Sequence, residues 1–186
     1  MMSTTHAFVG LLLASSMLFL APEFAVVGAV AAMAGGVFPD LDLFVGEHRK
    51  TLHYPDYYWV AAAPAVAVAA FAPGPLTVGA AFFLVSAALH SASDALGGGL
   101  GLRPWEDTSD RRGVYLHSRR RWIPPRRWVR YDGAPEDLAL AAAFALPGYL
   151  LFDGVVSQIV VAGLAVSVVY TAVRKRLPDL APEFLQ

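Results

Sequence analysis

The chain has 186 residues, of which 56% are hydrophobic and only 16% charged, whereas a water-soluble domain carries about 45–50% apolar and about 25% charged residues. A bilayer is therefore the expected solvent, and extensive intrinsic disorder is excluded. The absence of cysteine excludes disulfides, thiolate metal sites and cysteine nucleophiles, and a net charge of −1 gives no general attraction to nucleic acid or acidic lipid.

Six apolar segments rich in Ala, Val and Leu follow one another along the chain. We expect an all-α, polytopic membrane helical bundle, formed as a single domain over residues 1–186, with six hydrophobic helices and a polar cytoplasmic cap. The first three segments are shorter than the about 20 residues of a perpendicular span, so they could be tilted interfacial helices or parts of a packed bundle instead. The six segments are 7–20, 24–38, 57–71, 76–96, 138–152 and 155–173.

The breaks between these segments differ in length. Short connections with proline or glycine, such as 72–75, predict hairpins between antiparallel helices. Longer polar segments lie at 40–56 and 97–137, and the second is rich in arginine. The stretch 2–25 also resembles a signal peptide, but no positively charged residues precede its apolar core, which favours a retained helix.

The positions of the charges predict an orientation. If all six segments span, the N-terminus, both long polar segments and the C-terminal tail share one side of the membrane, and that side carries all 14 Lys and Arg residues. The short turns on the other side carry only Glu23 and Asp153. The positive-inside rule then predicts a multi-pass protein of the inner (cytoplasmic) membrane with both termini in the cytoplasm.

Ionisable side chains gather at the ends of four predicted helices on this same side. Charged groups near hydrocarbon are costly, about 2.5–3.5 kcal/mol for an aspartate at a helix centre, so they tend to be kept for a pathway, a partner or a metal. Carboxylate oxygens combined with imidazoles suit divalent metals, and we expect Zn or Mn first. The predicted metal ligands are His6, Asp40, Asp42, His53, His90 and Asp94.

Two spacings support this ligand set. His90 and Asp94 are four residues apart, on one face of a helix, and the pair Asp40 and Asp42 follows a proline at a spacing that lets both carboxylates face one cation. Taken singly, each has a structural alternative: His6 as an interfacial or capping side chain, the others as polar pairs or solvated loop groups. Six ligands exceed a tetrahedral zinc set, so either two ions bind or some of these residues orient the ligands.

Further residues are expected to act on the substrate. His48, or a free carboxylate such as Asp42, is the predicted catalytic group that moves a proton, and Arg49 is expected near the substrate. In the arginine-rich loop, Arg103 and His117 are predicted to bind a phosphate-bearing substrate, because a guanidinium pairs bidentately with phosphate. The alternative for this loop is a membrane-surface anchor, since Trp and Tyr lie at headgroup level and arginines attract anionic lipid. No known binding module accompanies the basic run, so nucleic acid is not an expected partner.

Several motifs keep a common order and spacing over roughly the first 105 residues. They are Thr5-His6-xxx-Gly10, Gly35-Gly36-x-Phe38-Pro39-Asp40-Leu41-Asp42, His48-Arg49-x-Thr51-x-His53, His90-xxx-Asp94-Ala95-Leu96 and Gly101-Leu102-Arg103-Pro104-Trp105. Together they resemble the YdjM-like membrane-bound metal-dependent hydrolases. The resemblance implies an inner-membrane, multi-helix hydrolase with a divalent metal. One departure is that His53 stands one residue further from Thr51 than in many relatives.

The expected function is metal-dependent hydrolysis at the cytoplasmic membrane face, on a phosphoester of a lipid or another amphiphile, with the bilayer as partner. A metal-independent lipid phosphatase also ends in His-xxx-Asp, but it needs Pro-Ser-Gly before the histidine, where this chain has Ala87-Ala88-Leu89. The closer alternative is non-enzymatic binding or transport of a divalent ion. Transport predicts charged residues near the middle of spans, whereas these lie at the ends.

Overall fold

The computed structural model describes residues 1–106 and 111–180, so residues 107–110 of the predicted loop 97–137 lie outside the described part. Within the described residues the chain is mostly helical, as expected, and six longer helices are joined by turns and two one-turn helices. They are α1 (Ser3–Ala14), α2 (Met17–Leu20), α3 (Ala25–Val37), α4 (Tyr57–Phe71), α5 (Pro75–Ser93), α6 (Pro135–Leu151), α7 (Gly154–Val173) and α8 (Leu177–Leu180).

The first predicted segment, 7–20, is divided in two. The hydroxyl of Ser15 donates to the carbonyl of Leu11 at 2.9 Å, and that of Ser16 donates to the carbonyl of Leu13 at 2.7 Å. Serine hydroxyls that bond to the preceding turn compete with the helical backbone, which explains why α1 ends here and α2 follows as a separate turn.

Other helix ends follow the expected signals. Pro75 and Pro135 stand at the first positions of α5 and α6, where a missing amide hydrogen costs nothing. The carboxylate of Asp56 accepts from the amide of Tyr57 and begins α4. Gly154 has a φ of +64°, which allows the tight connection between α6 and α7.

The expectation of an all-α chain needs one correction, a short antiparallel hairpin within the arginine-rich loop. Strand β1 (Val114–Leu116) pairs with β2 (Arg121–Ile123), with Tyr115 opposite Trp122. β-branched and aromatic residues favour strands, and a cross-strand aromatic pair stabilises the ladder by about 0.2–1 kcal/mol. Arg120 closes the turn with a φ of +48°.

Four segments are long and apolar enough to cross a membrane, consistent with a membrane protein. The expected count of six spans is not confirmed, because α4 has only 15 residues and α6 only 17. The four candidate spans are Ser3–Leu20, Pro22–Leu43, Pro75–Leu96 and Gly154–Leu180.

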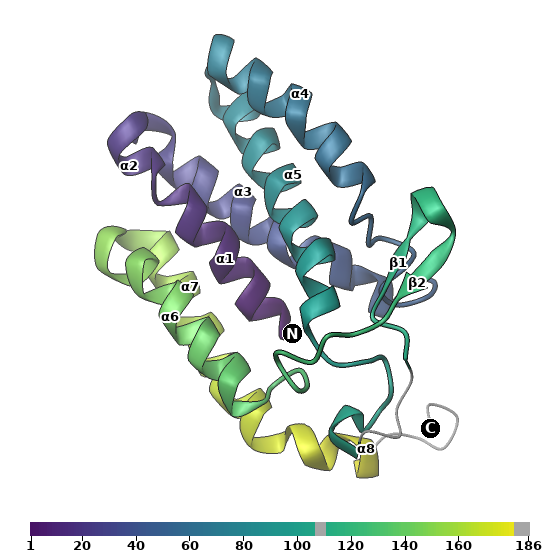
Figure 1. Cartoon of the computed structure of the whole chain (residues 1–186). Helices are drawn as coiled ribbons and strands as arrows, with labels where there is room; N and C mark the ends of the chain where they lie inside the picture. Colours follow the sequence, from purple (N-terminus) through teal and green to yellow (C-terminus); the bar gives the residue numbers. More distant parts are fainter. Residues whose placement is uncertain (107–110, 181–186) are drawn as a thin grey trace.

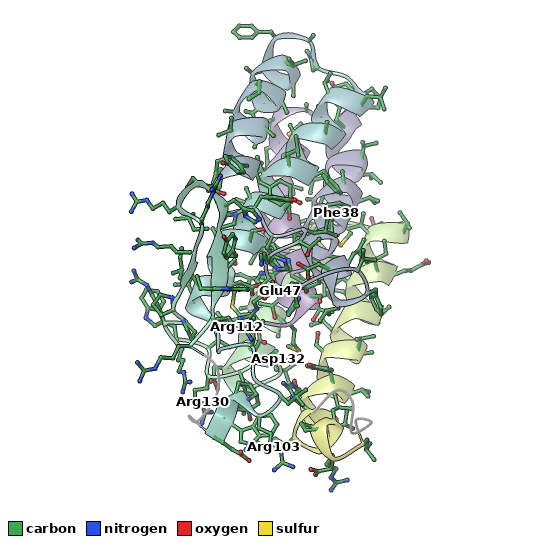
Figure 2. All side chains as sticks on the ribbon, turned by 90° about the vertical axis from the view of Figure 1, so that its right-hand side faces the viewer. Phe38, Glu47, Arg103, Arg112, Arg130 and Asp132 are labelled. Carbon is green, nitrogen blue, oxygen red and sulfur yellow. The ribbon has the colours of Figure 1, made fainter. Side chains whose placement is uncertain are left out.

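The two ends of the bundle carry different elements (Figure 1) and differ in polarity. At the end with α2 and the α4–α5 turn, Phe19, Phe71 and Leu76 are largely exposed. The N-terminus, the C-terminal ends of α3 and α5 and the β-hairpin lie at the opposite end. Figure 2 shows the labelled charged residues, among them Arg103 and Arg130, in the lower half of the molecule. The bundle therefore has one apolar end and one polar cap.

Helix α1 occupies the centre of the bundle, between α3 and α5 on one side and α6 and α7 on the other (Figure 1). Its Phe8 and Leu11 are fully buried and pack with Ala32 of α3 and Val160 of α7 in the apolar core. The N-terminal turn of α1 is thereby held against the ends of α3 and α5, where the polar groups of the cap meet.

Candidate metal centre

Four ionisable side chains from separate parts of the chain converge inside the polar cap. Asp40 comes from the 3-10 turn Phe38–Leu43 that follows α3, His53 from the loop before α4, and His90 and Asp94 from the end of α5. One nitrogen or oxygen atom of each lies within 4.8 Å of the other three, so the group could hold a metal ion. Asp40 is 9% exposed and the other three are fully buried.

Five of the six distances between these atoms are close to those of a tetrahedral ligand shell. His53 Nε2 lies 3.2 Å from His90 Nε2, 3.1 Å from Asp94 Oδ2 and 3.7 Å from Asp40 Oδ1. His90 Nε2 lies 3.3 Å from Asp40 Oδ1 and 3.6 Å from Asp94 Oδ2. A tetrahedral ion with ligands at about 2.0–2.1 Å separates its ligand atoms by about 3.4 Å, in the middle of these values.

The Nε2 atoms of His53 and His90 face each other. His90 Nδ1 lies 2.6 Å from the carbonyl oxygen of Gly36, which can only accept, so this nitrogen donates. His53 Nδ1 lies 2.8 Å from a carboxylate oxygen of Asp42 and donates in the same way. If both rings are neutral, the proton is on Nδ1 in each ring and both Nε2 atoms carry lone pairs. Two lone pairs 3.2 Å apart repel each other unless a cation or a proton lies between them.

Two other predicted ligands, His6 and Asp42, contact members of this group. His6 Nε2 donates to Asp94 Oδ1 at 3.1 Å, and its ring stacks on that of His90 with centroids 3.7 Å apart. Asp42 accepts from His53 with one oxygen and from His48 Nδ1 with the other, both at 2.8 Å. Distances of 2.8 Å are those of hydrogen bonds rather than of two ligands on one tetrahedral ion. In this arrangement His6 and Asp42 hydrogen-bond to the ligands, and Asp42, His48 and His53 form a second group whose atoms are close enough to hold an ion.

Electrostatics around His53 favour a positive charge in the centre. Burial opposes protonation of this imidazole, yet hydrogen bonds to the carboxylates of Asp42 and Asp94 raise its pKa above the ordinary value. The guanidinium Nε of Arg49 lies 3.4 Å from Asp94 Oδ2 and offsets part of the negative charge. Either a proton on His53 Nε2, which lies 3.1 Å from Asp94 Oδ2, or a bound cation would therefore balance these carboxylates.

A pair of glycines allows the helices that carry these residues to meet. A Cβ at Gly36 would lie 2.7 Å from Cα of Ala7 in α1, and one at Gly35 would lie 2.8 Å from Cα of Phe83 in α5. Both distances are below ordinary van der Waals contact. Only glycine therefore lets α3 approach α1 and α5 together, and this approach places the Gly36 carbonyl on His90.

A pocket of about 340 Å³ leads from the surface to this group. Asp40 is the member of the four-residue group that lines it, together with His48 and Arg49. His48 is partly exposed, and its Nδ1 is bonded to Asp42, so its Nε2 is free to take a proton from a molecule in the pocket. The predicted catalytic residue His48 thus lines the pocket, whereas Asp42 is buried and bonded to His53.

Arg49 is held in an unusual way. Its φ of +60° is uncommon for a residue with a side chain. Its Nη1 donates to the carbonyls of Gly98 at 2.6 Å and Gly113 at 3.3 Å, which ties the loops around the pocket together. Its Nε is buried and makes no hydrogen bond to any residue that the structure describes. Asp94 Oδ2 lies 3.4 Å from this nitrogen, so the charge of Arg49 is paired with a carboxylate of the candidate centre.

The structure does not bring Arg103 and His117 to this pocket. The exposed guanidinium of Arg103 bonds to Asp179 at 2.6 Å. The ring of His117 packs between Tyr54 and Tyr115, with centroids 4.5 and 5.0 Å away. Neither is among the described residues that line the pocket, so their predicted role in substrate binding receives no support from their positions.

Sequence patterns missed several polar partners of the centre. The hydroxyl of Ser3 donates to Asp40 Oδ2, and that of Ser93 contacts His6 Nδ1 at 3.2 Å. Ser3 precedes His6 by three residues and Ser93 follows His90 by three, so helical spacing was the signal that could have found them. The Gly36 carbonyl carries no such signal, because any residue supplies a carbonyl.

No family model, no curated protein and no solved structure matches the chain. The class of protein is therefore defined by the fold and the site alone. The chain is a mostly helical bundle with four candidate membrane spans and a buried group of two histidines and two aspartates that could hold a metal ion.

Proposed function

We propose that the protein is a zinc-dependent hydrolase that works at the cytoplasmic face of the inner membrane. The single observation that carries the proposal is the pair of facing Nε2 atoms of His53 and His90, 3.2 Å apart, while both Nδ1 atoms are engaged as donors. The resemblance to YdjM-like hydrolases and the gathering of basic residues at the polar cap support the same function and location.

The geometry of the group favours zinc over manganese. Two imidazoles and two carboxylates with near-tetrahedral spacing suit zinc, which has no geometric preference of its own and is commonly four-coordinate. Manganese and magnesium favour six ligands, mostly oxygen. Asp40, His53, His90 and Asp94 are the proposed ligands, and His6 and Asp42 hold them in orientation.

The cation would supply Lewis acidity, which lowers the pKa of a bound water and polarises the ester. His48 Nε2 takes the proton that the water loses, and Asp42 keeps that ring in the correct tautomer. Arg49 lines the pocket, and its guanidinium balances the charge of the ligand Asp94. Water adds across the ester bond, and the alcohol leaves with the proton that His48 returns.

Catalysis also requires an open position, because four protein ligands complete a tetrahedron. Zinc sites expand to five ligands during turnover, and the pocket reaches the group at Asp40. A fifth ligand would therefore enter beside Asp40, on the side of His48 and Arg49.

Metal analysis of purified protein tests the proposal, together with hydrolysis of the chromogenic phosphodiester bis(p-nitrophenyl) phosphate. We expect about one zinc per chain in the wild type, and loss of both zinc and hydrolysis in His90→Ala and Asp40→Ala. Ser91→Ala is the matched control, because Ser91 is buried on the same helix and its hydroxyl has no hydrogen-bond partner among the described residues. A wild-type protein that binds no divalent metal would overturn the proposal.

Non-enzymatic handling of a divalent ion is the second candidate, and the complete four-ligand set favours it. A closed tetrahedral site is typical of ions that are held rather than used. The ligands lie at helix ends rather than at mid-span, which argues against a transport path. Zinc flux into liposomes that carry the protein, together with an absence of hydrolysis, would establish this second function.

A further inference from the structure

The closed end of the β-hairpin carries three consecutive arginines. Arg119, Arg120 and Arg121 are all exposed, and none of them makes an ion pair with a carboxylate that the structure describes. Arg120 closes the turn in the left-handed conformation, with a φ of +48°. The tip of the hairpin is thus a concentrated positive charge, and its guanidinium groups are available to an external anion.

Other exposed arginines of the polar cap are already paired. The guanidinium of Arg103 bonds to Asp179 at 2.6 Å. That of Arg130 bonds to both carboxylate oxygens of Glu136, at 2.8 and 2.9 Å. The tip therefore differs from the rest of the cap in its lack of described carboxylate partners, not merely in its number of arginines.

The tip is fixed beside the first turn of α4 (Figure 1). The amide of Ser118 donates at 2.6 Å to the carboxylate of Asp56, whose other oxygen accepts from the amide of Tyr57 and begins α4. The ring of His117 packs on that of Tyr54, just before the helix. The depth of the tip is therefore set by the depth at which α4 begins.

Helix α4 begins near the edge of the apolar part of the bundle. It packs along α5, which belongs to the candidate span Pro75–Leu96 (Figure 1). Fifteen residues of helix are about 22 Å long, so α4 crosses most of a hydrocarbon core of about 30 Å from the turn that joins it to α5. Trp59 is 42% exposed and Val60 is 71% exposed near its start. The start of α4, and the hairpin tip beside it, thus fall at headgroup level.

A second part of the same loop lies at the same level. Trp128, between the hairpin and α6, is 69% exposed. It lines an apolar groove together with Leu140 of α6 and Leu96, the last residue of a candidate span. Indole rings favour the boundary between headgroups and hydrocarbon. The loop therefore meets the membrane surface beside α4 and again beside α6.

We propose that the hairpin tip binds anionic phospholipid in the leaflet next to the polar cap, with lipid phosphates on Arg119, Arg120 and Arg121. Guanidinium groups pair bidentately with phosphate, and each basic residue near an anionic membrane surface strengthens binding by about fivefold. Nucleic acid also presents phosphates, but the position of the tip at the membrane border favours lipid. This surface is separate from the cation centre, because none of the three arginines lines its pocket.

Native mass spectrometry of the detergent-purified protein tests the proposal with two probes. Dioleoyl phosphatidylglycerol and dioleoyl phosphatidylcholine have the same chains, but only the first has a net negative charge. We expect phosphatidylglycerol to bind at least about tenfold more tightly. Equal affinities for the two lipids would overturn the proposal.

Two double variants locate the binding surface. Arg119→Gln with Arg121→Gln should weaken binding of phosphatidylglycerol by about 10–30-fold and leave phosphatidylcholine unchanged. Arg103→Gln with Arg130→Gln is the matched control, because it removes the same charge from arginines that already have carboxylate partners. An equal loss in both double variants would show an effect of net charge and contradict binding at the tip.

Two further measurements guard the interpretation. Arg119→Lys with Arg121→Lys keeps the charges and should bind phosphatidylglycerol within about threefold of the wild type, whereas a loss as large as that of the glutamine variant would point to a damaged fold and sink the assignment. A single-stranded oligodeoxynucleotide should not displace the lipid. If it does so, and its own binding is lost in the glutamine variant, the partner is nucleic acid and the proposal fails.

Discussion

A single carboxylate, that of Asp42, joins the candidate metal ligand His53 to the candidate base His48. Each of its oxygens accepts from one imidazole at 2.8 Å, and one of them also accepts from the amide of Leu52 at 3.3 Å. The side chain is fully buried, so water cannot replace it. Asp42 therefore fixes the tautomer of both rings, and its effect reaches the centre through His53.

Replacement of Asp42 tests this positioning role. The amide of Asp42→Asn offers only one oxygen as an acceptor, so one imidazole loses its partner. We expect zinc affinity to fall by about 10–100-fold, measured by competition with a chelator, while thermal unfolding without metal changes less. Asp153→Asn makes the same chemical change away from the site and should leave zinc affinity unchanged. Wild-type affinity in Asp42→Asn would show that the carboxylate does not orient a ligand.

His48 should affect hydrolysis without affecting the metal. His48→Gln removes the nitrogen that takes a proton, so we expect kcat to fall by about 10²–10⁴-fold with full zinc content. His117→Gln is the control, because that ring packs among tyrosines outside the pocket. Loss of zinc from His48→Gln would place His48 among the ligands and contradict its assignment as the base.

At the scale of the helices, the site depends on how closely α3 approaches its neighbours. Gly35 and Gly36 stand at the end of α3, against Phe83 of α5 and Ala7 of α1. The next residues form the turn that carries Asp40 and Asp42. The short stretch from Gly35 to Asp42 therefore determines both how closely α3 approaches its neighbours and where the two aspartates lie.

A methyl group at Gly36 should separate α1 from α3. Gly36→Ala places its Cβ 2.7 Å from backbone atoms of Ala7 and His6, and we expect the protein to lose about 1–3 kcal/mol of stability. Gly79→Ala is the control, because the nearest atom to its Cβ is a Val27 methyl at 3.5 Å, an ordinary contact. Thermal unfolding in detergent measures both. An unfolding temperature that is unchanged in Gly36→Ala would show that the helices do not require this glycine.

The helices could be predicted from sequence largely because their apolar runs are long and end at Pro or Gly. The segment 57–71 coincides with α4, whereas 7–20 is divided between α1 and α2, where two serine hydroxyls bond to the preceding turn. The hairpin β1–β2 was missed, since strands of three residues are too short for a periodic signal.

The candidate site could be predicted in part. The four-residue spacing of His90 and Asp94 was enough to predict that they lie together. The order of the motifs predicted that His53 joins them, although its spacing from Thr51 is altered. Sequence could not predict which of these residues face the centre and which hold the ligands in orientation. His6 and His90 differ in this respect only through the rotation and packing of their helices. The role of Arg49 depends on a left-handed backbone that sequence does not reveal.

The whole molecule is polar at one end and apolar at the other, which sets its expected orientation in a bilayer. The helix ends that carry the candidate site lie at the polar cap, together with the described basic residues of the arginine-rich loop (Figure 2). If this cap is cytoplasmic, the α4–α5 turn faces the opposite side of the membrane.

Cysteine labelling tests that orientation on a clean background, since the chain has no cysteine. Ala72→Cys, in the α4–α5 turn, should react with a membrane-impermeant maleimide in intact cells. Arg119→Cys, in the β-hairpin, should react only after permeabilisation. Both positions are exposed, so accessibility within the fold does not distinguish them. The reverse labelling pattern would place the site outside the cytoplasm.

X-ray absorption spectroscopy at the zinc edge tests the cation centre most directly. The four-residue group predicts four nitrogen and oxygen ligands at about 2.0–2.1 Å, with the scattering pattern of two imidazoles, and one imidazole fewer or no bound zinc in His53→Ala. A shell of six oxygens without imidazole, or an identical shell in His53→Ala, would contradict the account.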